Sequence, residues 1–444
     1  MRPNDANAAA TYVDENADEN VDVLIVGAGI AGLTLARELK RQDRRALVLE
    51  ARDRVGGRTW TDHRLGDDLE IGGGWIHWMQ PHVWAEVSRY GLEVGESPLP
   101  DVAYWRDGDA LRHGTADELL TLMDRAMTLS LEGARTLFPF PHRPHEHTAW
   151  QAYDKLSVAD RVAGLDVPPV ERMLCDTMWA QNFNAPTDRA GLTQALRWGA
   201  VSNADWKLLL EICSRYKLVR GTAALADALR ADASGEIRFG TAVARIEQDA
   251  DGAVVTTRDG RRIGARAVVV TVPLAAARNI DLAFQLPAAA RKLLDEGQAS
   301  QGGKVWLRAR GRREKFIALG AGDAPLSLVQ WERETEDGFI AFGFSTDART
   351  HDLTDLAAVR RWAGALVPGI DIVEVTSHNW VDDEFTGQTW GMLRPQQLTA
   401  MGELTTPHGR VLFAGADYAS TWPSFMDGAI EGGLRAANAV RDLR

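Results

Sequence analysis

The first strongly patterned stretch of the chain extends from residue 22 to residue 58. It contains two apolar runs, at residues 23–26 and 46–49, and between them residues 33–40, where leucines and an alanine recur at helical spacing. Arg37 and its charged neighbours fall on the other side of that helix and are expected to face water. Short apolar runs are typical of buried strands, and a period near 3.6 is typical of a helix with one buried face. The pattern therefore predicts strand, helix, strand.

Three glycines and one acid stand at the junctions of this unit. Gly27, Gly29 and Gly32 follow the first apolar run, and Glu50 follows the second. Gly27 permits a sharp turn, Gly29 lets the backbone approach a pyrophosphate, and Gly32 lets the helix pack on the strand. The N-terminus of the helix then stabilises phosphate charge, and the acid accepts hydrogen bonds from a ribose hydroxyl. The stretch predicts a dinucleotide site.

Farther along, the pattern changes twice. Residues 116–213 carry apolar positions at helical spacing, and a Pro-Pro pair at 168–169 is expected to open one of these helices. Residues 237–274 form short apolar runs separated by Asp-Gly pairs at 251–252 and 259–260, which are hairpin signals. A helical block is therefore expected to precede a set of short strands.

Composition narrows the class of protein. A chain of 444 residues is too long for one ordinary core, so two domains are expected. The net charge of −12 argues against nucleic acid or an anionic membrane as partner, and no apolar run is long enough to span a bilayer. Cys175 and Cys213 stand alone, which indicates no disulfide framework, a reducing compartment and a cytoplasmic location. Residues 1–20 are polar and acidic and are expected to be a disordered leader without a signal peptide.

Three further motifs resemble those of the flavin amine oxidase family, which includes monoamine, polyamine and bacterial nicotine-pathway oxidases. They are EARDRVGGR at residues 50–58, GGGWIHW at 72–78 and the closing motif at 411–440. The motifs occur in the family's order and cover nearly the whole chain past residue 20. WIHW, followed by QPHVWAE, is most similar to the bacterial nicotine and pseudooxynicotine oxidases.

The resemblance implies an α/β fold of two domains. A Rossmann-like FAD domain of the glutathione-reductase type would stand beside a substrate domain with a mixed sheet and helices. The implied boundaries are 21–90, 215–275 and 405–444 for the discontinuous FAD domain, and 91–214 and 276–404 for the substrate domain, with a helical subdomain at 116–213.

FAD is the cofactor that the resemblance implies, and its attachment is expected to be non-covalent. Thr389 stands where the mitochondrial members carry the covalently attached cysteine. The residues assigned to the cofactor are Gly27, Gly29, Ile30, Ala31, Gly32, Glu50, Ala51, Arg52, Gly57, Arg58, Gly73, Gly74, Trp75, Ile76, Val243, Thr271, Trp380, Gly415, Asp417, Ser424, Phe425, Met426 and Ala429.

Four residues match positions next to the reacting groups in the family. Lys304 lies in an alternating strand, where the family's lysine holds a water against flavin N5. Trp390 and Phe425 match the two residues of the aromatic cage for the amine. His77 matches a substrate-tunnel position, and a buried histidine satisfied by its neighbours is an equal alternative.

The implied reaction moves a hydride from the carbon α to an amine nitrogen to FAD N5. Water then hydrolyses the imine, and the flavin passes its electrons to O2, giving hydrogen peroxide, or to another acceptor. The partners would be a small-molecule amine and the acceptor, and a homodimer is common in the family. An L-amino acid oxidase of the same fold is an alternative, although Gly73, Gly74, Trp75 and Ile76 replace the Gly-Gly-Met-Arg stretch of that class. Two further alternatives are a non-catalytic flavin-binding protein and a carbon–carbon desaturase.

Overall fold

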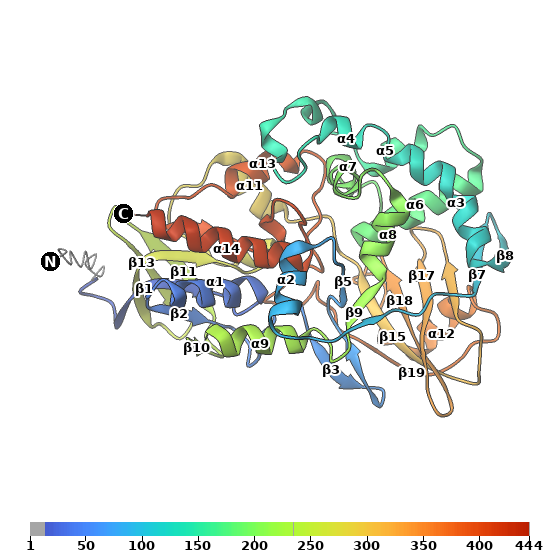
Figure 1. Ribbon diagram of the computed structural model, residues 1–444, viewed down its shortest axis with the longest axis horizontal. Coiled ribbons are helices and arrows are strands. Elements are labelled where there is room, and N and C mark those ends of the chain that lie inside the picture. The colour runs from blue at the N-terminus through green and yellow to red at the C-terminus, as the bar shows by residue number, and fades with distance from the viewer. Residues whose placement is uncertain (1–13, 234, 444) are drawn as a thin grey trace.

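Two large sheets organise the molecule, as the computed structural model shows (Figure 1). The model describes residues 14–233 and 235–443, so the first thirteen residues of the expected leader lie outside the described residues. The rest of that leader is ordered, because Asp18 and Arg262 exchange hydrogen bonds and a strand begins at Glu19. No described helix combines the length and the apolar character needed to cross a bilayer.

The first sheet has eight strands in the order β10-β2-β1-β13-β12-β11-β14, with β20 beside β13. Its parallel core consists of β1 (Glu19–Val26), β2 (Ala46–Leu49), β10 (Glu236–Arg238), β13 (Arg262–Val270) and β20 (Val411–Phe413). The remaining strands are β11 (Val243–Gln248), β12 (Ala253–Thr257) and β14 (Asp281–Leu282). The central parallel strands β1, β2, β13 and β20 bury apolar residues on both faces, which helices or loops cover.

Helices α1 (Ile30–Arg41), α9 (Ala223–Ala233) and α14 (Met426–Asp442) pack on one face of this sheet. The other face packs against α10 (Leu274–Ala277), α11 (Ala288–Glu296) and α13 (Gln397–Leu404). The predicted strand–helix–strand unit is confirmed as β1, α1 and β2. The two Asp-Gly pairs lie in the hairpins that join β11, β12 and β13, also as predicted.

The second sheet has seven strands in the order β19-β15-β18-β17-β16-β7-β8. They are β7 (Val102–Asp107), β8 (Ala110–Thr115), β15 (Gly303–Arg310), β16 (Phe316–Leu319), β17 (Leu328–Glu334), β18 (Gly338–Ser345) and β19 (Asp371–Ser377). One face packs against α12 (Leu356–Gly364), and the other packs under the helical block. That block contains α3 (Ala116–Ser130), α4 (Ala134–Leu137), α5 (Val158–Ala163), α6 (Pro169–Phe183), α7 (Leu192–Val201) and α8 (Trp206–Ser214).

Short elements connect the two sheets. They are the three-stranded sheet of β5 (Trp75–Ile76), β9 (Tyr216–Leu218) and β6 (Val94–Glu96), the hairpin of β3 (Thr61–Arg64) and β4 (Asp67–Glu70), and α2 (Pro81–Arg89). Pro169 occupies the first turn of α6, as predicted. The domain boundaries drawn from the sequence stay a prediction, and β14 joins the first sheet although it lies in the range given to the substrate domain.

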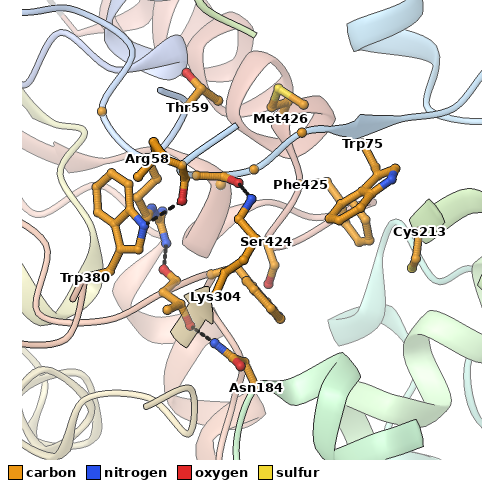
Figure 2. A pocket seen from close by; sticks show the side chains of 18 of the residues that line it. Arg58, Thr59, Trp75, Asn184, Cys213, Lys304, Trp380, Ser424, Phe425 and Met426 are labelled. Atoms are coloured by element: carbon orange, nitrogen blue, oxygen red, sulfur yellow. Dashed lines mark hydrogen bonds between the residues drawn. The ribbon is translucent and has the colours of Figure 1, made fainter. Parts of the chain in front are cut away.

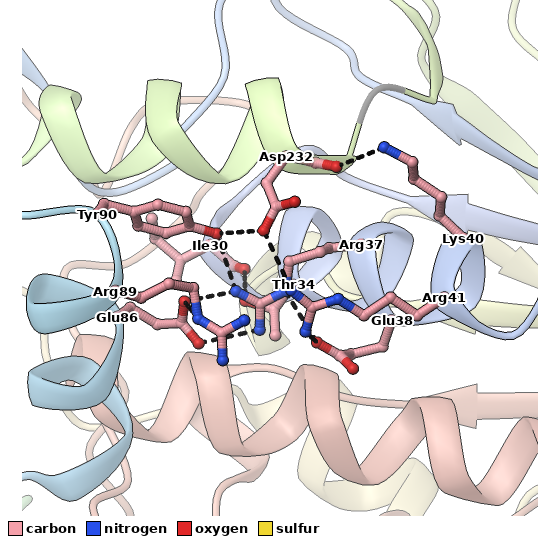
Figure 3. Close-up of polar contacts among 10 residues, drawn as sticks. All are labelled: Ile30, Thr34, Arg37, Glu38, Lys40, Arg41, Glu86, Arg89, Tyr90 and Asp232. Atoms are coloured by element: carbon pink, nitrogen blue, oxygen red, sulfur yellow. Dashed lines mark hydrogen bonds and ion pairs between the residues drawn. The ribbon is translucent and has the colours of Figure 1, made fainter.

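Arg37 corrects the expectation that the polar side of α1 faces water. Its side chain is 1% exposed and donates to both carboxylate oxygens of Glu86, at 2.5 and 2.9 Å, and to the hydroxyl of Tyr90 (Figure 3). Tyr90 in turn donates to Asp232 at the end of α9. The helix is covered on this side by α2 and α9, so the guanidinium is satisfied by protein groups in place of water.

Candidate active site

A single cavity of about 850 Å³ extends from the carboxyl ends of β1 and β2 to the face of the second sheet. Its walls come from segments far apart in the sequence, including the 71–75 segment, the 384–390 loop and the start of α14. Figure 2 shows part of this wall, with Arg58 and Trp380 on one side and Phe425, Trp75 and Cys213 on the other. The first two glycines of the dinucleotide motif and the two predicted cage residues, Trp390 and Phe425, therefore line the same cavity.

At the dinucleotide end, Gly27 and Gly32 have the turn and the close packing that their positions predict. Gly27 has a φ of +104°, and a Cβ on Gly32 would lie 2.0 Å from the carbonyl oxygen of Gly27, so the helix packs directly on the turn. No side chain caps the N-terminus of α1, so the amide groups at Ile30 and Ala31 face the cavity without a protein partner at the cap. This end of the cavity is suited to a pyrophosphate.

Glu50 is 4% exposed and accepts hydrogen bonds from the backbone amides of Ala28, at 2.7 Å, and Arg52, at 2.9 Å. Each carboxylate oxygen keeps a second lone pair for a ligand hydroxyl. Ala51, Val243 and Thr271 also line this end, and the Thr271 hydroxyl donates to the carbonyls that end β1.

The two predicted arginines are held by carboxylates. Arg52 donates to Asp383 at 2.5 Å, and Arg58 donates to Asp417 at 2.6 Å and to the Thr389 carbonyl at 2.8 Å. Both guanidinium groups line the cavity, but Asp417 does not. Its side chain is buried beneath Arg58, where it also accepts from Leu274 N and Gln388. Asp417 therefore positions Arg58, which corrects the expectation that it meets the cofactor directly.

The glycine segment at residues 72–74, between β4 and β5, forms one wall of the middle of the cavity. Gly73 is open to the cavity, with no protein atom within 4 Å of where its Cβ would be, and Gly57, at a φ of +61°, and Gly74 also line it. Trp380 donates from its indole nitrogen to the Ile71 carbonyl at 3.2 Å. A flat ring lying against this wall would occupy the space that a side chain on Gly73 would fill.

Lys304 lies on β15 and reaches the same wall. Its side chain is 9% exposed, its Nζ donates to the Gly72 carbonyl at 2.7 Å, and the ring centroids of Trp306 and Trp75 lie 5.3 and 5.8 Å away (Figure 2 shows the Gly72 bond). Burial lowers the pKa of this lysine from its ordinary value of 10.5 to about 7, because the charged form is separated from water. The group can thus gain or lose a proton near neutral pH.

Helix α14 begins at the cavity with no side-chain cap, and Met426 and Ala429 in its first turn line the wall. The residue before its N-cap, Ser424, has a φ of +81° and donates from its hydroxyl to the Gly391 carbonyl. A helix N-terminus provides positive potential, and here it faces the middle of the cavity.

Aromatic side chains form the far wall. Trp390 is fixed by a hydrogen bond from its indole nitrogen to the Asn182 carbonyl, at 2.8 Å, and its ring meets Phe344 edge-on, with centroids 6.0 Å apart. Phe425 packs against Trp198, with centroids 5.1 Å apart. The apolar wall excludes water and offers ring faces to a cation.

Five of the predicted residues do not line the cavity: Gly32, Ile76, His77, Gly415 and Asp417. His77 is the important correction, because it was placed among the catalytic residues. Its ring is fully buried, with Nδ1 accepting from Met79 N and Nε2 lying 3.4 Å from Glu211, and burial lowers its pKa. The structure supports the alternative, a satisfied buried histidine.

Other lining residues were not predicted from the sequence. They include Lys217, Gln330, Glu332, Phe342, Phe344 and Trp198. For the residues on β17 and β18, the alternation of side chains between the two faces of a strand was the available signal, since residues two apart share one face. The signal was ambiguous, because nothing local tells which face of that sheet borders the cavity.

These residues fit FAD on three structural observations. Two helix N-termini without side-chain caps face the cavity, the glycine segment at 72–74 leaves room for a flat ring, and a buried carboxylate stands where a ribose would bind. Thr389 lines the cavity and carries no thiol, so a thioether cannot form at this position.

The comparisons with known proteins agree with this site. Residues 30–441 match the family model for flavin-containing amine oxidoreductases. The chain is 33% identical to the nicotine dehydrogenase of Pseudomonas putida over 95% of its own length and 88% of that protein. It is 29% identical to the (S)-6-hydroxynicotine oxidase of Paenarthrobacter nicotinovorans, covering 94% of this chain and 99% of that one.

Among solved structures, a double mutant of putrescine oxidase superposes with a TM-score of 0.82 at 21% identity, covering 95% of this chain and 99% of that one. Cyclohexylamine oxidase from Brevibacterium oxydans gives a TM-score of 0.78, also at 21% identity, over 95% and 99% of the two chains. These likenesses show the two-domain fold. The chain belongs to the flavin-containing amine oxidoreductase family, and it is an FAD-dependent enzyme that oxidises amines.

Proposed function

We propose that this enzyme oxidises a secondary or tertiary amine joined to a small aromatic or cyclic body. The observation that carries the proposal is the aromatic end of the cavity, where Trp390 and Phe425 stand in one continuous space with Lys304 and the dinucleotide end. The local likeness of WIHW to nicotine-pathway enzymes and the names of the relatives support the substrate class.

Trp390 and Phe425 bind and orient the amine in this proposal. Ring faces attract an ammonium cation by about 0.5–2 kcal/mol, and two such faces also fix the orientation of the amine. Trp390 is held by Asn182 and Phe425 by Trp198, so neither ring has to be ordered when the substrate enters.

Lys304 holds and moves a proton at its Nζ atom. Its pKa near 7 lets both forms exist at neutral pH, and the carbonyl of Gly72 fixes the position of the nitrogen. FAD, when bound, accepts the hydride from the carbon α to nitrogen and supplies electrons to the final acceptor. The apolar wall keeps bulk water from the reacting groups.

The arrangement favours an amine over an amino acid. Four arginines line the cavity among the described residues, and none is free at the aromatic end. Arg52, Arg58 and Arg258 belong to the dinucleotide end, where they pair with Asp383, Asp417 and Glu384, and Arg215 pairs with Glu96. A substrate carboxylate would lack the bidentate partner that amino acid oxidation requires.

We propose O2 as the final electron acceptor, with hydrogen peroxide as product, a cytoplasmic location and a homodimeric assembly. A second acceptor class is supported by the relatives, since two of them are named dehydrogenases and a third is named an oxidase. Mixing the reduced enzyme with aerated buffer distinguishes the two acceptors, because rapid recovery of the yellow colour supports O2 and slow recovery favours another acceptor.

The substrate class is tested by anaerobic mixing of the holoenzyme with a panel of primary, secondary and tertiary amines. We expect cyclic and aryl-bearing secondary or tertiary amines to bleach the flavin absorbance, and linear primary amines and L-amino acids to leave it unchanged. Trp390→Ala should weaken amine binding and slow bleaching while FAD stays bound. Bleaching by amino acids alone would contradict the proposal.

A further inference from the structure

One charged pair in the cavity has no part in the proposed reaction. Lys217 on β9 donates from Nζ to Oε1 of Glu332 on β17, at 2.7 Å, and the two side chains are 17% and 12% exposed. Both residues line the cavity. Removing two charges from water costs free energy that the pair regains only with good partners, so a pair at the wall of a ligand cavity requires an explanation.

The backbone directs both charges to this wall. The pairing of β17 with β18 shifts register between Trp331 and Arg333, so that Glu332 is the extra residue of a β-bulge. Bulges commonly redirect a side chain beside a binding site. Lys217 is the register partner of Trp75 in the pairing of β5 with β9, which places it next to the aromatic wall.

The ammonium group of Lys217 has donors to spare. Glu332 is the one hydrogen-bond partner that the described residues give it, whereas an ammonium carries three N–H donors. Its Nζ lies 4.7 Å from the ring centroid of Trp75 and 5.8 Å from that of Phe342, both of which line the cavity. A ligand that lies along the aromatic wall is therefore within reach of a strong, unused donor.

The charge of the pair decides which ligand group suits it. Glu332 balances Lys217, so the pair as a whole is neutral. An ammonium on the substrate would be repelled by Lys217 and attracted by Glu332, and a carboxylate the reverse, so neither gains a net charge attraction and each still gives up its own hydration. A neutral hydrogen-bond acceptor takes the free donor without that penalty.

We propose that Lys217, oriented by Glu332, donates a hydrogen bond to a neutral acceptor, a carbonyl oxygen or an aromatic ring nitrogen, on the part of the amine substrate remote from the reacting carbon. This inference rests on the proposed function and narrows its substrate class. Lys217 is then a specificity-determining residue, and diamines and amino acids are disfavoured ligands.

The test compares ligands that differ only in the acceptor. Nicotine is paired with 1-methyl-2-phenylpyrrolidine, which lacks the ring nitrogen, and 4-(methylamino)-1-phenylbutan-1-one with N-methyl-4-phenylbutylamine, which lacks the carbonyl. Binding to the dithionite-reduced holoenzyme under nitrogen is measured by calorimetry, so that no turnover occurs. We expect the acceptor-bearing member of at least one pair to bind about tenfold more tightly, the effect of one hydrogen bond to a charged group.

Lys217→Met should reduce the ratio of the two affinities, with and without the acceptor, to about one, because the donor is lost. Lys292→Met makes the same change at an exposed lysine of α11 and should leave the ratio as it is. Glu332→Gln keeps the donor and removes its counter-charge. Burial lowers the pKa of Lys217 and Glu332 opposes that effect, so this variant should lose the preference at a lower pH than the wild type.

An unchanged ratio in Lys217→Met, or putrescine binding more tightly than either acceptor-bearing amine, would overturn the proposal. Failure of the proposed function gives a different result. In that case no amine bleaches the oxidised flavin, whatever the ratios measured on the reduced enzyme.

Discussion

The chemistry of Lys304 results from the burial of its amino group. An ordinary lysine is charged at neutral pH, but this one is 9% exposed and has no carboxylate within hydrogen-bond distance among the described residues. Burial without a direct counter-charge lowers its pKa to about 7 and turns a simple cation into a group that exchanges protons at physiological pH.

Lys304→Met tests that role. The variant keeps the apolar stem of the side chain, so the protein should fold and stay yellow, while flavin reduction or reoxidation slows by about 10²-fold, as expected for loss of a proton-transfer group. Stopped-flow absorbance follows each half-reaction separately. Unchanged rates in both half-reactions would remove Lys304 from the mechanism.

The same residue predicts how stability depends on pH. The pKa of Lys304 falls from 10.5 to about 7 on folding, so between these values the unfolded chain binds a proton that the folded chain lacks. Stability of the wild type relative to Lys304→Met should therefore be lowest at pH 7 and below, and should rise as pH increases toward 10. Thermal unfolding of the two holoenzymes at pH 6, 8 and 10 measures the difference, and a difference that is flat with pH would contradict it.

A side chain at position 73 should impair FAD binding without impairing folding. A Cβ at this position meets no protein atom, so Gly73→Ala should fold with the circular dichroism of the wild type but lose FAD during gel filtration. The matched change Gly72→Ala places a Cβ 1.8 Å from the Arg58 carbonyl oxygen and should lower stability itself. Full FAD retention by the first variant would place the flavin ring elsewhere.

At the scale of elements, α1 is positioned by a polar network as well as by apolar packing. Arg37 connects it to Glu86 and Tyr90 around α2, and Tyr90 connects this group to Asp232 on α9 (Figure 3). The N-terminus of α1 faces the cavity, so the network at its other end fixes the direction in which the dinucleotide-binding amides point.

Arg37→Met leaves Glu86 buried without its main partner and should lower the free energy of unfolding by about 3 kcal/mol or more. Arg41 lies on the same helix with a side chain 43% exposed, and Arg41→Met should cost less than about 1 kcal/mol. Urea unfolding gives both values. Equal effects of the two substitutions would show that the network contributes no more than a surface ion pair.

At the scale of the whole molecule, the site exists because two sheets meet. The dinucleotide end uses the carboxyl ends of β1 and β2, and the aromatic end uses one face of the second sheet, with the 71–75 segment between them. Ligand sites commonly form at such junctions, where each unit supplies one wall.

The way FAD is held is a property of the assembled site, and it predicts non-covalent binding. Thr389 lines the cavity in place of a cysteine, and Cys213 lies across the cavity from Arg58 and Trp380 (Figure 2). Trichloroacetic acid should therefore release the yellow colour into the supernatant. Colour in the protein pellet would show a covalent bond that these side chains do not suggest.

Local signals in the sequence were sufficient for the strand–helix–strand unit, its glycines and the matched family motifs. They failed where contact with another element decides the outcome. Arg37 follows the polar side of its helix by period, yet α2 and α9 bury it. His77 has the neighbours of a site residue, yet its ring turns toward Met79 and Glu211 and not into the cavity.

The sequence by itself determined the cofactor class and the family, because the turns, helix starts and close contacts that hold a dinucleotide depend on residues near one another in the chain. Tertiary structure decided which side chains beyond the matched family positions line the cavity, and what chemistry burial gives them. Lys217, Glu332 and Lys304 lie on β9, β17 and β15, and their shared environment arises only when these strands pack around one cavity. Burial and charge pairing, which set their chemistry, are properties of that packing and not of local sequence.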